Sequence, residues 1–547
     1  MNKKLFLYLL LIIILFLGGL LRFYHLKEKG FFLTDEAANS REAVFVESLF
    51  SHTFKSLFFK NITDQERATY ISNHLEGLPL ANPKPGHASL IALFGTFTAG
   101  VKDYTSSLMS AFFGLATIFL IYLLGKSLYS SQVGVLTAFL LSISGYHLLY
   151  SRQGIGEINT LFFFVLATTL YLQSIKDKYF SLWYLALSGL FIGIAYSCNY
   201  RWILMPMFFF LYELYFFYRK RPYFSTENLK RFLTLSIAMI LPLAIYELFY
   251  HLVLIIFRRA NVIFSFRTYF ELLFDNFYRF GGSASFNIYD FISYPYYLYK
   301  LEGIIICLLL IYGVFKLIKS YQPLHFIILS PFLISLIFFG FYSADFPRFF
   351  VIALPSIFLI IAKSLEDLIK SSTSRKKKIL ILILILIGIF SVPKIRNILS
   401  LNSGLRESFK FLESLKDLKH ITTHEQVSLF YLKDPKLVKD IRSIKDLANL
   451  KDLYGEGYHY LLVDTQKYIT KFPHFPLESS PLLVKIESKI KPILVIKENR
   501  GLYFQYWFEH CVVSFSKTLA FFKNVDKKEV SEVRIYHLKD LFKKEKL

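Results

Sequence analysis

Two neighbouring stretches decide the fold: the apolar run LFLYLLLIIILFLGGLL (residues 5–21) and, shortly after it, the polar segment FFLTDEAANSREAVF (residues 31–45). The apolar run, extended to residue 23, has the length that a helix needs to cross a hydrocarbon core about 30 Å thick. Lys3 and Lys4 precede it as in a signal sequence, but no small-residue cleavage site follows. This favours an uncleaved signal anchor. The second stretch places two adjacent carboxylates where the chain leaves the membrane.

The rest of the chain repeats the apolar pattern. Of its 547 residues, 54% are hydrophobic and 19% are charged, whereas a soluble protein carries about 25% charged residues. The apolar excess falls in blocks of roughly 18–25 residues, each long enough to span a bilayer. We therefore expect an all-α polytopic membrane protein with about eleven transmembrane helices, over residues 5–23, 106–125, 132–149, 157–175, 181–198, 202–218, 232–257, 303–319, 323–342, 349–369 and 378–394.

Charge in the short loops predicts the orientation of these helices. Cytoplasmic loops are rich in lysine and arginine. Alternate loops fit that rule if the N-terminus lies inside, through Lys126, Lys176 with Lys178, YRKRP (218–222), Lys316 with Lys319, and SRKKK (374–378). An odd number of spans then places the C-terminal part outside the cytoplasmic membrane. Basic residues beside spans also explain much of the net charge of +23, so membrane lipids rather than nucleic acid are the expected partners.

The short outer loops each carry one arginine close to a span end. These are Arg152 in YSRQGIGE, Arg201 in NYRW and Arg348 in DFPRFF. One such arginine is readily explained by snorkelling to lipid headgroups. Three together favour a shared anion at the outer face, because guanidinium groups suit phosphate.

Two longer outer segments, residues 24–105 and 258–302, add to this face. The second carries Arg258 and Arg259, which we also consider as phosphate ligands. In the first, apolar residues recur at helical spacing and predict an amphipathic helix in the membrane interface. Those residues are Val46, Phe50, Phe54 and Leu57.

The chain divides into a transmembrane domain (residues 1–395) and an extracytoplasmic part (residues 396–547). The second part has mixed charge, two strand-like runs in YHYLLVD and PILVIKE, and a helical stretch in LRESFKFLESLKDL. We expect a small α/β domain there. It contains no glycine-rich phosphate loop and no nucleophile elbow.

The carboxylates Asp35 and Glu36 are the first catalytic candidates. Successive helical residues point about 100° apart, so the two cannot act on one point in the same way. A purely structural interpretation stays open, because Thr34 could cap a helix that starts at Asp35 and carboxylates suit a first helical turn.

Other polar residues are expected near the same level of the membrane. Lys84, at the rigid turn of NPKPGH, could meet a phosphate or could be a solvated loop lysine. His87 in the same turn, Glu157 at the outer end of a span, and Glu247 one turn from His251 are expected on the acceptor side or in support. Such a site could transfer a sugar from a lipid phosphate, which needs a base for the acceptor and cations for the departing phosphate.

At this point the chain resembles the GT-C superfamily of integral-membrane glycosyltransferases, in the branch of the protein O-mannosyltransferases and the lipid A aminoarabinose transferases. The resemblance rests on the order and membrane placement of LLRFYHL with TDEA, KPGHASLIALFG, LLSISGYHLLYSRQGIGEINTLFFFVLATTLYL, GLFIGIAYSCNYRWILMPM, PRFFVIALPSIFLIIA and YHYLLVD.

The resemblance implies a polyprenyl-phosphate sugar donor and a single displacement with inversion at the anomeric carbon. It maps the base onto Asp35, the donor-phosphate lysine onto Lys84, and the Tyr-Ser-Arg turn onto Arg152 with Glu157 after it. Arg348 matches the arginine of the family's late Arg-Tyr segment. Here Phe349 replaces the tyrosine, and KPGH replaces the commoner Lys-Pro-Pro.

The expected enzyme is thus a glycosyltransferase of cell-envelope glycosylation whose acceptor is a glycan, a lipid or a protein. Two alternatives are an oligosaccharide ligase or polymerase with a lipid diphosphate donor, and a transporter or flippase of a lipid-linked saccharide. A transporter should show midplane polar sites or repeated halves, and neither is evident. No cofactor is required. A divalent cation beside Asp35 and Glu157 is compatible with some relatives, but no ligand set demands one, and the three cysteines have no zinc spacing.

Overall fold

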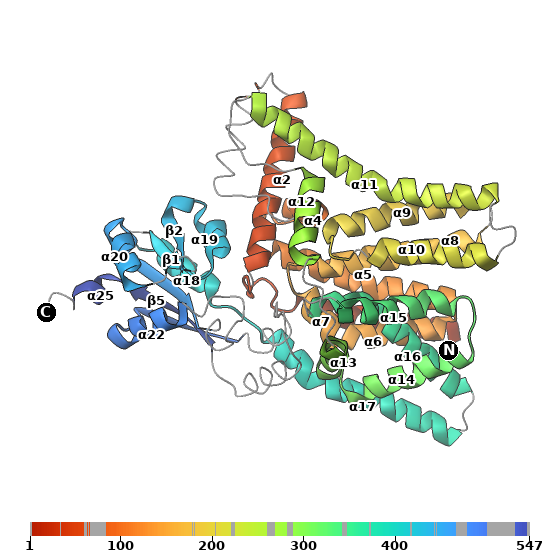
Figure 1. Cartoon of the computed structure of the whole chain (residues 1–547). Coiled ribbons are helices and arrows are strands. Elements are labelled where there is room, and N and C mark those ends of the chain that lie inside the picture. Colours follow the sequence, from red (N-terminus) through yellow and green to blue (C-terminus); the bar gives the residue numbers. More distant parts are fainter. Residues whose placement is uncertain are drawn as a thin grey trace.

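The computed structural model describes most of the chain and shows a helical bundle joined to a small α/β domain (Figure 1). The described residues are 3–32, 34–58, 63, 65, 84–177, 179, 181–202, 204–219, 225–259, 268–281, 288–341, 347–370, 374–415, 418–441, 444, 446–465, 479–499 and 531–543.

Each of the eleven predicted spans overlaps helical residues of the described part, and the span predicted over 132–149 falls on two helices. Within the described residues, seven helices, or the parts of them named here, are long and apolar enough to cross a membrane: α1 (Lys4–Phe23), α5 (Thr105–Leu128), α8 (Glu157–Lys176), α9 (Ser181–Cys198), α11 (Thr226–Leu252), η1 with α16 (Pro347–Lys370) and α17 (Ile381–Leu399). The whole of α1, α11 and α17 covers Lys3–Phe23, Thr226–Arg259 and Ser374–Leu399. The pair α6 (Ser131–Ile143) and α7 (Gly145–Ser151), bent by 63°, makes an eighth if it is one span. The remaining three are shorter, namely α10 (Leu204–Arg219), α14 (Ile304–Lys319) and α15 (His325–Phe341).

Small residues let neighbouring spans approach closely. A Cβ atom on Gly134 of α6 would lie 2.5 Å from the carbonyl oxygen of Tyr122 in α5. One on Gly193 of α9 would clash with the carbonyl oxygen of Met239 in α11. Such contacts are how helices pack in lipid, where burial of apolar surface alone does not drive helices together.

The predicted helix of the first outer segment is confirmed as α2 (Thr34–Phe58), which packs against α4 (Pro85–Phe97). Val46 is buried, whereas the side chains of Phe50, Phe54 and Leu57 lie outside the described part. In the second outer segment the helices are α12 (Tyr269–Gly281) and α13 (Ile288–Glu302). Figure 1 shows α2 standing across one end of the bundle, between the spans and the α/β domain.

The predicted α/β domain is confirmed in its strands. YHYLLVD contains β3 (Tyr460–Asp464) and PILVIKE contains β4 (Leu494–Glu498). With β1 (His420–Thr422), β2 (Val438–Asp440) and β5 (Ser531–His537) they form a sheet of order β2-β1-β3-β5-β4, in which β1 runs parallel to β2 and β3 and the other pairs are antiparallel. The described helices and turns of the domain are α18 (Leu405–Glu413), α19 (Glu425–Leu432), η2 (Pro435–Leu437), α20 (Leu447–Gly455), α22 (Ser479–Lys489) and α25 (Lys539–Lys543).

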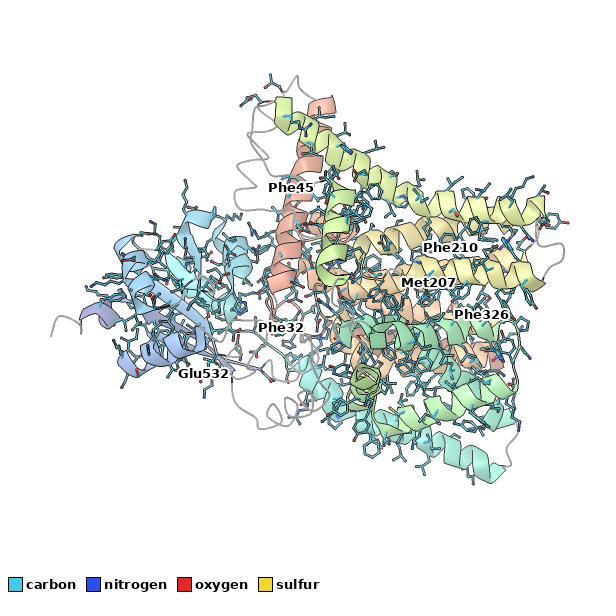
Figure 2. The ribbon with its side chains drawn as sticks, in the orientation of Figure 1. Phe32, Phe45, Met207, Phe210, Phe326 and Glu532 are labelled. Carbon is cyan, nitrogen blue, oxygen red and sulfur yellow. The ribbon has the colours of Figure 1, made fainter. Side chains whose placement is uncertain are left out.

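The two domains share apolar core at their junction. Phe31 and Ala37, from the start of the first outer segment, pack in one cluster with Phe409, Val427 and Leu462 of the α/β domain. Phe32 faces the other way and belongs to the cluster of the bundle, and it lies at the junction in Figure 2. The segment around Asp35 is therefore held from both sides.

Candidate active site

Asp35, Glu157 and Arg348 meet at the end of the bundle next to α2. One guanidinium nitrogen of Arg348 (Nη1) donates to Asp35 Oδ2 at 3.4 Å, and Arg348 Nε lies 3.5 Å from Glu157 Oε1. The side chains of Arg348 and Glu157 are each 1% exposed, whereas that of Asp35 is 35% exposed. The arginine thus joins a buried carboxylate to one that solvent or substrate can reach.

Each of these groups stands at the beginning of a helix. Asp35 lies in the first turn of α2, Glu157 is the first residue of α8, and Arg348 is the second residue of η1 (Pro347–Ala353). Lys84 directly precedes α4, whose first residue is Pro85. Proline suits this position because its missing N–H would have no helical partner there. Helices that begin at one level of a bundle bring residues far apart in sequence to one surface.

Lys84 and Arg201 complete the cluster electrostatically. Lys84 is buried, and Asp35, Glu157, Arg201 and Arg348 all act on its charge. Among these five residues, three cations stand against two carboxylates. Glu157 also accepts a hydrogen bond from Asn199 Nδ2 at 3.4 Å, and Asn199 Oδ1 accepts one from the backbone N–H of Arg201.

The charges around Asp35 keep it ionised. Burial raises the pKa of the Asp35 carboxyl, but Arg348, Lys84 and Arg201 outweigh burial and hold that pKa below its usual 3.8. Burial, followed by the neighbouring Arg201, lowers the pKa of the Lys84 ammonium from 10.5, and the two carboxylates act against this. An ionised carboxylate beside several cations can accept a proton while the cations bind an anion.

Glu36 points into a different environment from Asp35. It is fully buried, and its Oε1 accepts from Lys29 Nζ at 3.0 Å and from the backbone N–H of Gly154 at 2.7 Å. Its Oε2 accepts from the backbone N–H of Phe32 at 2.7 Å. Three donors therefore use this carboxylate to tie α2 to the loop after α7. Lys29 was not among the predicted residues. Its position seven residues before Glu36 was the one signal in the sequence that the two could form an ion pair.

Arg152 lies on the end of the first span. Its Nη1 donates to the carbonyl oxygens of Leu21, Arg22 and Tyr24, at 2.8–3.1 Å. These are carbonyls at the C-terminal end of α1, which lack partners within the helix. The backbone oxygen of Arg152 accepts from Lys29. The contacts described for Arg152 thus lead to α1 and Lys29 and not to Asp35.

His87 is buried one turn after Lys84. Its Nε2 donates to the carbonyl oxygen of Gly154 at 3.2 Å, and its Nδ1 accepts from Asn159 Nδ2 at 3.2 Å. Burial, together with the positive charge of Lys84, lowers the pKa of the imidazole to about 3. His87 is therefore a neutral support for the loop that also holds Glu36.

The remaining predicted residues lie elsewhere. Glu247 accepts from the backbone N–H of Phe270 at 2.9 Å and pairs with His251 at 3.1 Å, so it links α11 to α12. Arg258 is exposed at the end of α11, and the side chain of Arg259 lies outside the described part. The contacts described for Glu247 do not lead to the Asp35 cluster.

The comparisons with known proteins agree with this architecture. Residues 82–246 match the family described as dolichyl-phosphate-mannose-protein mannosyltransferase. The ArnT protein of Cupriavidus metallidurans, solved bound to undecaprenyl phosphate, superposes with a TM-score of 0.55 at 11% identity, over 85% of this chain and 94% of that chain. The chain has the GT-C fold of membrane glycosyltransferases.

A second solved structure supports the GT-C assignment. It is the oligosaccharyltransferase AglB of Archaeoglobus fulgidus, in complex with an inhibitory peptide and a dolichol-phosphate. Its TM-score is 0.54 at 12% identity, over 90% of this chain and 73% of that chain. No curated protein sequence matches the chain. The fold expected from the motifs, a multi-pass membrane bundle with a small α/β domain, is confirmed.

A metal ion has no ready set of ligands among the described residues. An oligosaccharyltransferase structure with Zn and sulfate is similar to this chain (TM-score 0.51, 11% identity, 84% of this chain and 69% of that chain). Within the described part, however, no three His, Cys, Asp or Glu side chains gather as metal ligands would. The carboxylates Asp35 and Glu157 instead share the guanidinium of Arg348, so the residues present do not fit a metal in this arrangement.

Proposed function

We propose that the protein is an inverting glycosyltransferase. It would move a sugar from a polyprenyl-phosphate donor to an acceptor hydroxyl or phosphate, at the outer face of the cytoplasmic membrane. The observation that carries this proposal is the partly exposed Asp35 carboxylate, held ionised on buried Arg348 beside Lys84 and Arg201. In support, the fold is that of proteins solved with undecaprenyl phosphate and dolichol-phosphate.

Asp35 acts as the base in this proposal. The acceptor oxygen forms a bond to the anomeric carbon as the bond from that carbon to the phosphate oxygen breaks. The proton of an acceptor hydroxyl passes to Asp35, whereas an ionised phosphate acceptor has none to give up. The electron pair of the broken bond stays on the lipid phosphate. A single displacement of this kind inverts the anomeric carbon. Because its pKa lies below 3.8, Asp35 is available as a base at neutral pH.

The cations act on the leaving group. A polyprenyl-phosphate sugar is a phosphodiester, and its phosphate gains a second negative charge when the sugar departs. Cations fixed in a site from which water is largely excluded stabilise such a developing charge far better than water does. In this proposal Lys84, Arg201 and Arg348 take this role, and Glu157 orients Arg348 from its buried side.

Glu36 and Arg152 have supporting roles in this proposal. The side chain of Arg152 donates to backbone carbonyls, and that of Glu36 accepts from Lys29 and backbone N–H groups, so the two help to hold α1, α2 and the loop after α7 together. They fix where the first turn of α2 lies without contacting substrate.

A panel of labelled donors tests the proposal. Purified protein in nanodiscs is given polyprenyl-phosphate sugars and, in parallel, lipid diphosphate saccharides, with membrane extract as the source of acceptor. We expect release of free lipid monophosphate and a product of inverted anomeric configuration. Turnover of the diphosphate donors alone would indicate an oligosaccharide ligase. Movement of intact donor across a bilayer without release of lipid phosphate would indicate a transporter.

A further inference from the structure

The α/β domain reaches the first turn of α2 through a buried histidine. His424 Nδ1 lies 3.4 Å from the hydroxyl oxygen of Thr34, and its Nε2 lies 2.6 Å from Asp464 Oδ2. The side chain of His424 is 3% exposed and that of Asp464 is not exposed. An ionised carboxylate can only accept, so Nε2–H donates to Asp464, and in the neutral imidazole Nδ1 accepts from the Thr34 hydroxyl. Thr34 directly precedes Asp35.

The topology of the sheet places this pair. His424 follows β1 by two residues, and Asp464 is the last residue of β3. The two strands are parallel neighbours with Thr422 opposite Leu462, so their carboxyl ends meet at one edge. That edge faces α2, because α19, which starts right after His424, packs along α2. The pair is therefore built into the sheet and not carried on a long loop.

Other contacts hold the same face of α2. Arg41 donates to Gln426 Oε1 at 2.5 Å, and Arg41 lies seven residues, about two helical turns, after Thr34. Between these two polar contacts, Ala37 packs into the core of the α/β domain, as Phe31 does before the helix begins. The α/β domain thus contacts α2 both before and after Asp35.

A separate contact fixes the domain to the bundle. Asp103, between α4 and α5, accepts from Arg406 Nη2 at 2.7 Å and from the hydroxyl of Tyr431 at 2.6 Å. Arg406 belongs to α18 and Tyr431 to α19. The sheet edge that carries His424 is therefore anchored to the bundle independently of α2.

We propose that His424 and Asp464 are positioning residues of the active site. They act through Thr34 to fix the first turn of α2, so that Asp35 stays in register with Arg348. This inference rests on the proposed role of Asp35 as base. A first helical turn lacks several backbone partners, and the Asp35–Arg348 contact is long at 3.4 Å. The hold from the α/β domain therefore adds to that of Glu36 in fixing where the Asp35 carboxylate points, and a displacement of about 1 Å can cost on the order of 100-fold in rate.

Thr34 variants test the link with the smallest change. Thr34→Val removes the hydroxyl and keeps the shape, whereas Thr34→Ser keeps the hydroxyl. We expect Thr34→Val to lower kcat by about 10-fold or more, with donor KM changed less than about threefold. Thr34→Ser should restore most of the rate. Equal kcat for Thr34→Val and the wild type would overturn the proposal.

His424→Asn and Asp464→Asn test the other two residues of the Thr34–His424–Asp464 contact. The matched control is His420→Asn, which alters a second buried histidine of the same domain whose ring bonds Ser428 and the carbonyl oxygen of Leu418. We expect the first two variants to lower kcat as Thr34→Val does, and the control to leave it unchanged. An equal loss in all three would mean that the histidines only keep the domain folded, which contradicts a positioning role.

Hydrogen exchange of α2 gives a measurement that needs no turnover. In the wild type and in His420→Asn, the amides of residues 38–42, whose helical acceptors are the carbonyls of residues 34–38, should exchange slowly. In His424→Asn and Thr34→Val they should exchange several-fold faster, while α4 stays unchanged. If wild type turned over no donor, the proposed function would fail but this experiment would still decide the link. Unchanged exchange in both variants would show that the Thr34–His424 contact does not hold the start of α2, which would overturn the proposal.

Discussion

Arg348 and Asp35 lie 313 positions apart in sequence, and a guanidinium nitrogen of the one stands 3.4 Å from a carboxylate oxygen of the other. This contact joins the late arginine of the bundle to the first outer helix. The two side chains differ in exposure, since Arg348 is buried and Asp35 is partly exposed. The arginine brings positive charge to the one carboxylate in the cluster that a substrate can reach.

Arg348→Lys should impair the enzyme although it keeps the positive charge. A lysine has one ammonium group in place of the planar fork with which Arg348 reaches Asp35 and Glu157 together. We expect kcat/KM for the donor to fall by about 100-fold, the usual loss when one charge-stabilising donor is removed from such a site. The measurement is release of lipid phosphate under initial-rate conditions. Arg396→Lys, an exposed arginine of α17, is the control, and an equal effect in both variants would contradict the assignment.

The pH dependence of donor binding should report Lys84. Its pKa lies below 10.5 in the folded protein, so the ammonium loses its proton earlier than usual as the pH rises. We expect the Kd of a polyprenyl phosphate to increase on the alkaline side of neutrality. In Lys84→Arg that increase should vanish, because arginine stays charged. An alkaline limb that is identical in the variant would exclude Lys84 as its source.

Mildly acidic solution, down to pH 5, should leave the Asp35 carboxylate ionised. The pKa of Asp35 is held below 3.8, so the base form is present at pH 5 and is lost only as the pH falls through that lowered pKa. We expect kcat of wild type to show no loss from Asp35 between pH 5 and pH 7. A loss centred near pH 6 that disappears in Asp35→Glu would contradict this.

Glu36 should matter to stability more than to chemistry. Glu36→Ala leaves the ammonium of Lys29 buried without its carboxylate, and breaking a buried pair in this way costs about 3–5 kcal/mol. The measurement is the midpoint of thermal unfolding in detergent, with activity normalised to folded protein. Lys29→Met combined with Glu36→Leu should recover part of the stability. If Glu36→Gln unfolded like wild type but released no lipid phosphate, Glu36 would be a catalytic group.

Asp103→Asn should loosen the α/β domain. The carboxylate accepts from both Arg406 and Tyr431, and hydrogen bonds to charged groups are worth about 1.5–3 kcal/mol each. We expect faster limited proteolysis between α17 and α18, with the bundle itself unaffected. Asp177→Asn, in a cytoplasmic loop of the predicted topology, is the control and should be cleaved like wild type.

The sequence predicted the parts of the fold that depend on local patterns. Apolar blocks predicted the helices, because length and hydropathy decide what crosses a bilayer. Their number is less well determined, since α10, α14 and α15 are shorter than a usual span. The strands of YHYLLVD and PILVIKE were also visible, because strand-forming residues are concentrated in them.

The candidate site was predicted only in part, for a physical reason. Asp35, Lys84, Glu157 and Arg348 stand at or next to helix starts, and Arg201 lies in the turn between α9 and α10. The predicted topology puts all five at one face of the membrane, so the sequence could group them. The partners of Glu36 and Arg152 are largely backbone groups and one lysine. No pattern of residues in the sequence predicts such contacts. His424 follows β1 and Asp464 ends β3, and only the parallel pairing of these two strands reveals their contact.

The central claim is that Asp35 is the base of a transfer from a lipid phosphate. The most direct test compares wild type with Asp35→Asn in nanodiscs, measuring binding of a polyprenyl-phosphate sugar and release of the free lipid phosphate. Glu28→Gln, an exposed carboxylate of the same segment, is the matched control. The proposed mechanism predicts that Asp35→Asn binds the donor but releases lipid phosphate at least about 1,000-fold more slowly, whereas Glu28→Gln behaves like wild type. Release by Asp35→Asn at the wild-type rate would contradict it.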